Sequence, residues 1–582
     1  MDFYNTFFMV MLSFGGLMAL VTLVLVLRRG FSREAGEIGG WELRGAPRRI
    51  AAVARTTVAE GLRAKVASGF ALLILVSLPV FYFAAEGDGT IKGQVQMFMI
   101  YSLGLTSFLL SLLTIFFSCR SLSVEVASRQ IYSIVSKPIP RWQILAGKWV
   151  GIMSVNVVLL GIACVAAYVG TQATVSKFKT QLRHALATYG GLTPAQAADA
   201  VAALDHVRGA GKKGRESPVV FAMAEAMGIT PPQVVDVLLR LPEGTRVNLR
   251  RFDELRRQVL VSRVSVSPKD RDLREDVDRF YRKLQEEGRL PEDWSEGKIR
   301  EQIEKELLGG ECTVPFGGVR TWRLKGPLPP KGRADFLMSV RFKINVSKDL
   351  PAVYAPELGQ LERDTLLCLW GVGNPATPAY FEVLEPFAVR NFTEFEIPVD
   401  CLEEDGTIQV NYGNIDPRRA DTVFDLLAEP CGLQVLYTLG TFETNLFQVF
   451  LAVLIEIACL AAFGVCCSTF LSFPVGSLIM IALFIISVCM PFVYEAVAVT
   501  NDYMPPELQD FQFQLRRSVV DVLGWGLSIG DCDPVHRLGN GEAVGWPRLW
   551  SMGWRYLLIK CGAAMAVAVL VFRRRELAAV IV

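Results

Sequence analysis

Residues 446–466 have the sequence LFQVFLAVLIEIACLAAFGVC, in which Glu456 is the only charged residue. A helix of about 20 mostly apolar residues is long enough to cross the hydrocarbon core of a bilayer. The mean hydropathy of +0.34 and the 51% of hydrophobic residues also favour a multi-pass membrane protein. Counting every window of this kind predicts about seven transmembrane helices, at 7–27, 66–85, 95–118, 149–171, 446–466, 475–494 and 555–572.

The distribution of Lys and Arg predicts how these helices are oriented. Segments 28–65 and 119–148 and the tail that begins at Arg573 are all basic, and they fall on one side of the membrane when seven crossings alternate. Such loops usually face the cytoplasm. The sequence before the first window, MDFYN, has no positive charge, which indicates a signal anchor rather than a secretory signal. We therefore expect a cytoplasmic (inner) membrane location, with the N-terminus outside and the C-terminus inside.

A polar stretch, residues 172–440, separates the fourth and fifth windows and falls outside in this topology. Its first part has apolar residues at helical spacing, and its second part alternates with a period of two. The sequence thus predicts an extracytoplasmic helical region over 172–308 and a β-sandwich-like domain over 309–440. This domain could bind an extracytoplasmic partner or a glycan, or form a structural cap. The positions that carry the two patterns are Leu273, Val277, Phe280 and Leu284, then Ile299, Ile303 and Leu307, and then Met338, Val340, Phe342, Ile344 and Val346.

Cysteine and histidine usage gives no sign of a metal site. The 12 cysteines form no CxxC motif, and the three histidines do not lie at ligand spacing. The segment GAGKKG at 209–214 does not satisfy the P-loop pattern and is interpreted as a linker. Disulfides are possible between cysteines of the polar regions, with the pairing left open: Cys312, Cys368, Cys401, Cys431 and Cys532.

The most informative motif connects the third and fourth windows. Residues 121–148 have the sequence SLSVEVASRQIYSIVSKPIPRWQILAGK. It predicts a short amphipathic helix along the membrane surface with an apolar ridge at Ile131, Ile134 and Val135. Pro138 and Pro140 then impose an extended turn before a second helix enters the bilayer.

This pattern resembles the coupling region of type-2 ATP-binding-cassette (ABC-2) permeases. The shared pieces are S-x-E at 123–125, S-K-P-x-x-R at 136–141 and G-K at 147–148, just before a span. The chain is similar in particular to bacterial permeases grouped with multicopper-enzyme maturation transporters. The amphipathic segment 48–65, the outer segment 495–553 as a re-entrant hairpin and the ending at 572–577 also fit the family. The likeness covers 46–171 and 441–577, and the first window and the polar stretch lie outside the family pattern.

The resemblance implies a transmembrane permease subunit, expected to be an exporter, that forms a dimer, as a homodimer in the simplest case. It also implies a separate ABC ATPase that binds ATP, so this chain is expected to be no enzyme and to hold no cofactor. The net charge of +2 is close to neutral and indicates no nucleic-acid partner. The expected domains are a signal anchor and basic linker (1–45), two permease halves (46–171 and 441–582), and the regions 172–308 and 309–440 between them. The residues implied for ATPase coupling are Glu125, Arg129, Lys137, Pro138, Arg141, Gly147 and Lys148.

Glu456 is a second candidate, because a carboxylate inside a membrane span is costly and commonly functional. We expect it either to line the translocation path or to be a protonated side chain bonded to a neighbouring helix, and Lys560 is a conceivable partner. An alternative function is a membrane-anchored extracytoplasmic receptor or scaffold that displays a binding domain. An intramembrane enzyme has no support, since no HExxH or GxSxG motif lies in a span.

Overall fold

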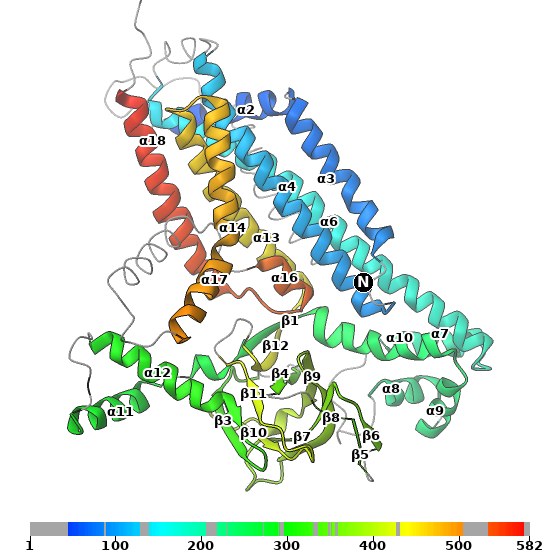
Figure 1. The fold of residues 1–582 in the computed structure, drawn as a ribbon. Coiled ribbons are helices and arrows are strands. Elements are labelled where there is room, and N and C mark those ends of the chain that lie inside the picture. Colours follow the sequence, from blue (N-terminus) through cyan, green and yellow to red (C-terminus); the bar gives the residue numbers. More distant parts are fainter. Residues whose placement is uncertain are drawn as a thin grey trace, which may run out of the picture. The chain divides into compact units, whose positions relative to one another are not determined.

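The chain folds into two compact units (Figure 1). The membrane unit comprises Met1–Phe178 and Phe442–Val582, and the inserted unit comprises Lys179–Thr441. The predicted span at 7–27 lies outside the described residues. The computed structural model describes residues 45–63, 65–85, 89–127, 139–204, 218–228, 230–271, 273–288, 290, 296–329, 336–346, 350, 352–355, 359–426, 431–503 and 533–574.

Ten helical elements make up the described part of the membrane unit. Five stretches in the described residues are long and apolar enough to cross a membrane: α4, α6, α13, Phe473–Met490 of α14, and Trp546–Phe572. A sixth is reached if α2 and α3, which are bent by 70° relative to each other, form one span. The elements are α2 (Ala46–Arg63), α3 (Lys65–Ala84), α4 (Ile91–Ala127), α6 (Arg141–Thr188), α13 (Phe442–Ser468), α14 (Phe473–Tyr503), α16 (Pro534–Gly539), α17 (Trp546–Met552), the π-helix η6 (Gly553–Cys561) and α18 (Gly562–Arg574).

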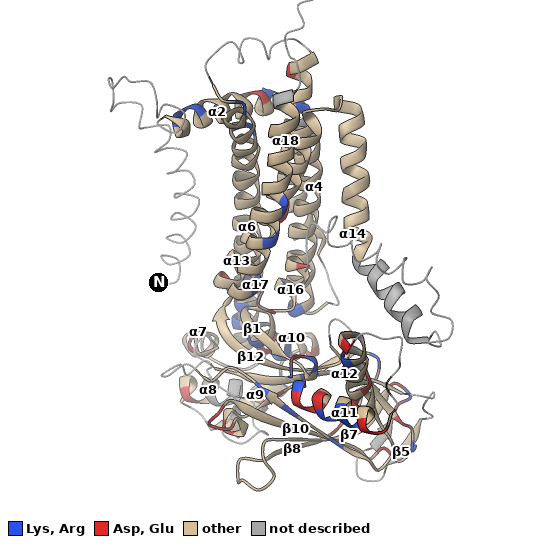
Figure 2. Ribbon diagram, turned by 90° about the vertical axis from the view of Figure 1, so that its left-hand side faces the viewer, with Lys and Arg blue, Asp and Glu red and all other residues tan. Residues whose placement is uncertain are grey.

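Helix α13 contains the stretch quoted above and is the most enclosed of the candidate spans, with 72% of its apolar window buried. It packs closely on α4 because a small residue lies at the contact: a Cβ added at Gly464 would be 1.8 Å from Ser118 Oγ. Small residues let membrane helices approach in this way. Charged residues are sparse along these helices and frequent over the inserted unit (Figure 2).

Two helices differ from the predicted boundaries. Helix α4 continues without interruption to Ala127, so residues 121–127 are the end of a long helix and not the start of a separate surface helix. Helix α6 continues to Thr188, well past the predicted end of the span at 171. The region predicted to begin at 172 therefore begins inside a helix, and the two units divide at Phe178.

The inserted unit combines helices with two main antiparallel sheets. One sheet has the strand order β1-β12-β4-β11-β2, with β9 also paired to β4, and the other has the order β3-β10-β7-β8. Strands β5 and β6 form a separate pair. The elements are α7 (Pro194–Ala203), α8 (Pro218–Met227), α9 (Pro231–Leu239), α10 (Glu243–Glu254), η2 (Leu255–Val259), β1 (Val261–Val266), η3 (Pro268–Asp270), α11 (Arg274–Glu286), α12 (Glu296–Cys312), β2 (Thr313–Val314), β3 (Val319–Lys325), β4 (Met338–Val346), β5 (Val353–Ala355), β6 (Gly359–Leu361), β7 (Thr365–Val372), β8 (Phe381–Ala388), β9 (Phe392–Ile397), η4 (Val399–Cys401), β10 (Thr407–Asn414), β11 (Thr422–Phe424) and β12 (Leu433–Thr441).

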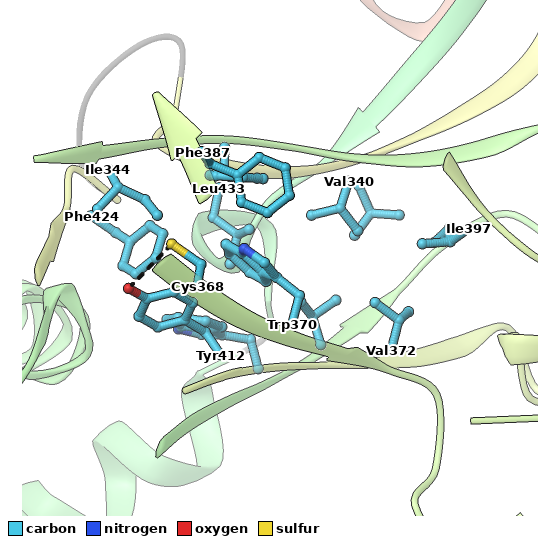
Figure 3. Close-up of a cluster of buried hydrophobic side chains, with 14 of the residues drawn as sticks. Val340, Ile344, Cys368, Trp370, Val372, Phe387, Ile397, Tyr412, Phe424 and Leu433 are labelled. Atoms are coloured by element: carbon cyan, nitrogen blue, oxygen red, sulfur yellow. Dashed lines mark hydrogen bonds between the residues drawn. The ribbon is translucent and has the colours of Figure 1, made fainter. Parts of the chain in front are cut away.

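The two sheets share one hydrophobic core, as in a β-sandwich (Figure 3). At its centre the ring of Trp370 on β7 lies 4.5 Å from that of Phe342 on β4 and 4.8 Å from that of Tyr412 on β10, measured between centroids. The predicted alternation in β4 is confirmed, because Val340, Phe342 and Ile344 are all buried in this core.

Three details of the inserted unit correct the sequence interpretation. Strand β1 lies in the region predicted to be helical and pairs with β12. Phe280, placed on the apolar face of its helix, is 41% exposed, and Tyr281 packs against the cluster of Leu273 and Val277 instead. No disulfide joins the described cysteines of the polar regions: Cys312, Cys368, Cys401 and Cys431 are free thiols, and Cys532 lies outside the described residues.

Candidate coupling site

A buried ion pair joins the end of α4 to the beginning of α6. The Nζ of Lys148 lies 2.6 Å from Oε1 of Glu125 and donates to the carbonyl oxygen of Ser121 at 2.5 Å. Lys148 is 1% exposed and Glu125 is 6% exposed. Charges removed from water need such close pairing, because their desolvation is expensive. The pair therefore fixes the two helices on either side of their connection, residues 128–140.

Helix α2 packs directly on the first turns of α6. A Cβ added at Gly147 would lie 2.6 Å from Val53 Cβ and 3.0 Å from the carbonyl oxygen of Ile50. One turn later, a Cβ at Gly151 would lie 2.8 Å from the carbonyl oxygen of Ala54. The two glycines form a small-xxx-small pair, which allows backbone-to-backbone contact between membrane helices. The glycine before Lys148 is thus required by its contact with α2.

Two further contacts connect the same part of α6 to the C-terminal half of the membrane unit. The guanidinium of Arg141 donates to the carbonyl oxygen of Phe572 and lies 5.4 Å from the centroid of its ring. Trp149 Nε1 donates to the carbonyl oxygen of Ala458 on α13 at 3.0 Å. The start of α6 therefore contacts α2, α4, α13 and α18.

Comparison with known proteins identifies this part of the chain. Residues 8–189 match the family model described as ABC-2 family transporter protein. This part of the chain is an ABC-2 permease domain. The matched range contains α2, α4, the connection and the start of α6, which together make the site. No curated protein and no solved structure matches the permease. The narrower likeness to multicopper-enzyme maturation transporters stays a prediction.

The structure places four of the seven predicted coupling residues in this permease site. Glu125 and Lys148 form its ion pair, Gly147 makes its contact with α2, and Arg141 binds the end of α18. Arg129, Lys137 and Pro138 lie outside the described residues. The motif therefore brings together residues 23 positions apart, although its role in ATPase binding stays a prediction.

Sequence reasoning missed two contributors to the site. Gly151 continues the contact that Gly147 begins, and the G-x-x-x-G spacing could have revealed it. Glu60 on α2 is exposed and repels the carboxylate of Glu125. Nothing in the local sequence around Glu60 indicates this proximity, which follows only from the packing of α2 on the site.

Glu456, the other candidate of the permease, is half-buried on α13. Lys560, its suggested partner, is 8% exposed at the end of the π-helix η6, with its Nζ 4.5 Å from the centroid of the Tyr556 ring. The next residue, Cys561, contacts the carbonyl oxygen of Ala458 at 3.5 Å, so η6 packs on α13 two residues beyond Glu456. π-Helical turns occur often at functional sites. Glu456 and Lys560 thus lie at a similar level of two adjacent helices.

Proposed function

We propose that this permease is the membrane subunit of an exporter, and that a separate ABC ATPase drives it by binding near the connection between α4 and α6. The observation that carries the proposal is the buried ion pair between Glu125 and Lys148. Because it fastens the helices on both sides of the connection, a force applied to residues 128–140 passes to both spans together.

The contacts around the pair suggest where that force goes. Gly147 and Gly151 pack α6 on α2, and Trp149 and Arg141 bind α13 and α18. Packed interfaces change between discrete arrangements instead of deforming continuously. A shift at the connection is therefore passed on to the C-terminal half of the permease, where α13 carries Glu456.

The proposed topology follows from charge. The basic segments flanking the spans favour a cytoplasmic position for the connection between α4 and α6, which is the side on which ATP is available. The inserted unit then lies outside a cytoplasmic membrane, and a second permease subunit, in the simplest case an identical one, completes the transporter. The family match supports this function over a receptor or scaffold.

A photo-crosslinking experiment tests the proposal. The permease is co-expressed with a candidate ABC ATPase from the same organism, with p-benzoylphenylalanine at position 129 or 137. We expect an adduct with the ATPase from both positions, and none from position 92 at the other end of α4. The docking site would lie elsewhere if neither position gave an adduct and the ATPase still co-purified with the variant Glu125→Gln/Arg141→Gln.

A further inference from the structure

The inserted unit has a polar cleft of about 850 Å³. This volume lies within the range of about 300–1,000 Å³ that is usual for small-ligand sites. Strands β3 and β10 form one wall of the cleft. The end of β1 with the segment after it, the loop after β7 and the turn before β10 contribute the rest. All of its lining residues belong to the inserted unit, so the cleft is complete within that unit.

Strand alternation places a set of polar side chains on this wall. In β3 the side chains of Trp322 and Leu324 point into the core, so Arg323 and Lys325 are exposed on the opposite face. Strand β10 pairs with β3 so that Gln409 lies opposite Arg323, and Thr407 lies opposite Lys325. Directly opposed residues have Cβ atoms about 5 Å apart, within joint reach of one ligand group.

Several acidic and basic groups of the cleft are already engaged. Asp270 accepts hydrogen bonds from the backbone nitrogen and the hydroxyl of Ser267, at 2.8 and 2.7 Å. Arg271 pairs with Glu311 at 2.8 Å. Among the described residues, Arg323 and Lys325 make no hydrogen bond and no ion pair within 4 Å, although Lys325 lies near enough to Asp405 to interact with its charge. Both cations can therefore still donate hydrogen bonds to an anion.

The same cleft also carries hydrogen-bond acceptors. Glu403 and Asp405 are exposed at its rim, and Asp405 uses part of its capacity on Thr407. These carboxylates would repel a densely charged ligand such as a polyphosphate or a nucleic acid. They suit a ligand that has hydroxyl donors as well as a single anionic group, since ionised carboxylates act only as acceptors.

The amide groups of the wall are held in place. Gln409 Nε2 donates to Asn411 Oδ1 at 3.1 Å, and Thr321 Oγ1 donates to the same oxygen at 2.7 Å. Beside Asn411, the strand β7 has Gly371, over which Tyr380 lies so closely that an added Cβ would be 1.8 Å from its hydroxyl oxygen. Polar groups fixed on strands lose little freedom when a ligand binds.

We propose that this cleft binds an acidic saccharide of the uronic-acid type, whose carboxylate pairs with Arg323 and Lys325 while its hydroxyls bind Gln409 and Glu403. The proposal does not depend on the transport function, because it concerns the inserted unit alone. It would give the permease a recognition site for a sugar acid on the inserted unit.

Binding of glycans to the intact permease in detergent tests the proposal. An array of neutral, uronic-acid and sulfated oligosaccharides identifies the class, and calorimetry with the best uronate and its methyl ester measures Kd. We expect the neutral ester to bind at least about tenfold more weakly, because hydrogen bonds to charged groups contribute about 1.5–3 kcal/mol. The double variant Arg323→Gln/Lys325→Gln should lose affinity for the uronate to the same extent.

A matched control removes one arginine and one lysine charge from the inserted unit at positions outside the cleft. Arg363 and Lys283 are exposed cations of the inserted unit outside the cleft, so Arg363→Gln/Lys283→Gln should leave Kd unchanged. Gln409→Ala provides a second cleft variant with no change of charge, and it should weaken binding even if the double variant misfolds. The proposal would be overturned if no uronate bound or if neutral glycans bound more tightly. It would also be overturned if inorganic phosphate competed as well as a uronate, or if the control variant lost as much affinity as the cleft variant.

Discussion

The Nζ of Lys148 lies 2.6 Å from Oε1 of Glu125, and this pair is buried between α4 and α6. Its position explains why an acidic residue in one part of the motif accompanies a lysine 23 residues later. Each of the two charges would be costly without the other. The motif thus encodes a fixed spacing between two helices around their connection.

The first prediction concerns this pair. Glu125→Gln or Lys148→Met alone should lower the free energy of unfolding by about 3–5 kcal/mol, because each leaves an uncompensated buried charge. The double variant should lose less than the sum of the two, because it removes both charges. Thermal unfolding of the purified permease in detergent, arranged as a double-mutant cycle, measures this coupling. Glu60→Gln serves as a control, since this carboxylate is exposed and repels Glu125. Additive losses in the cycle would contradict the pairing.

The second prediction concerns the contact of α6 with α2. Gly147→Ala should destabilise the permease by about 1–3 kcal/mol, the usual effect of overpacking, because its Cβ would be 2.6 Å from Val53 Cβ. Gly161→Ala in the same helix is the control. No atom lies within 4 Å of a Cβ at that position, so alanine should be neutral or slightly stabilising there. Because the clash involves the Cβ of Val53, Val53→Gly should cost less stability in the Gly147→Ala background than in the unchanged chain. Equal melting temperatures for the two glycine variants would argue against the close contact.

Local composition and periodicity predicted the five apolar spans found in the described residues and strand β4 of the sandwich. Alternation in 338–346 predicted β4 and its buried residues. Strand β1 was missed because VSRVSV is short and its valines do not alternate strictly with its polar residues, and it becomes a strand by pairing with β12 at the edge of a sheet. Phe280 was misplaced because the period of 3.6 allows either Phe280 or Tyr281 at that turn, and tertiary packing selects Tyr281.

For the coupling site, the motif predicted the residues but not their partners. The pairing of Glu125 with Lys148, and the binding of Arg141 to Phe572, depend on contacts between helices that are distant in the chain. Periodicity and composition contain no information on such contacts. The G-x-x-x-G spacing at 147–151 is a local signal of a close helix contact, and the sequence interpretation did not use it.

The third prediction concerns the pH dependence of the inserted unit. Asp416 is buried, which opposes its ionisation, but hydrogen bonds from Arg418 and from the backbone of Leu367 outweigh burial and lower the pKa of its carboxyl. A lowered pKa in the folded state contributes stability above the unfolded value of about 3.9, and this contribution is lost as the pH falls through the folded value.

Hydrogen exchange of β7 in the intact permease checks this expectation. After correction for intrinsic rates, protection of Leu366–Val372 should fall as the pH drops below about 4. Asp416→Asn should lower protection already at neutral pH, because Arg418, whose side chain is 2% exposed, loses the carboxylate that balances its charge. Asp364→Asn, an exposed carboxylate in the adjacent loop, should change neither value. A pH profile that Asp416→Asn leaves unaltered would mean that another group controls acid stability.

The last prediction concerns Glu456 on α13. If this carboxylate lines the translocation path, Glu456→Gln should reduce ATP hydrolysis by the reconstituted transporter at least about tenfold, equivalent to about 1.4 kcal/mol in the barrier, without reducing assembly with the ATPase. Glu443→Gln is the matched control, because Glu443 lies in the first turn of the same helix, before the apolar stretch that begins at Leu446. Lys560→Met separates the two roles left open for Glu456. If Glu456 only balances Lys560, the variant Glu456→Gln/Lys560→Met should regain stability and activity together. If Glu456 lines the path, this variant should regain stability while its ATP hydrolysis stays low. A stable Glu456→Gln variant with full activity would exclude a role in transport.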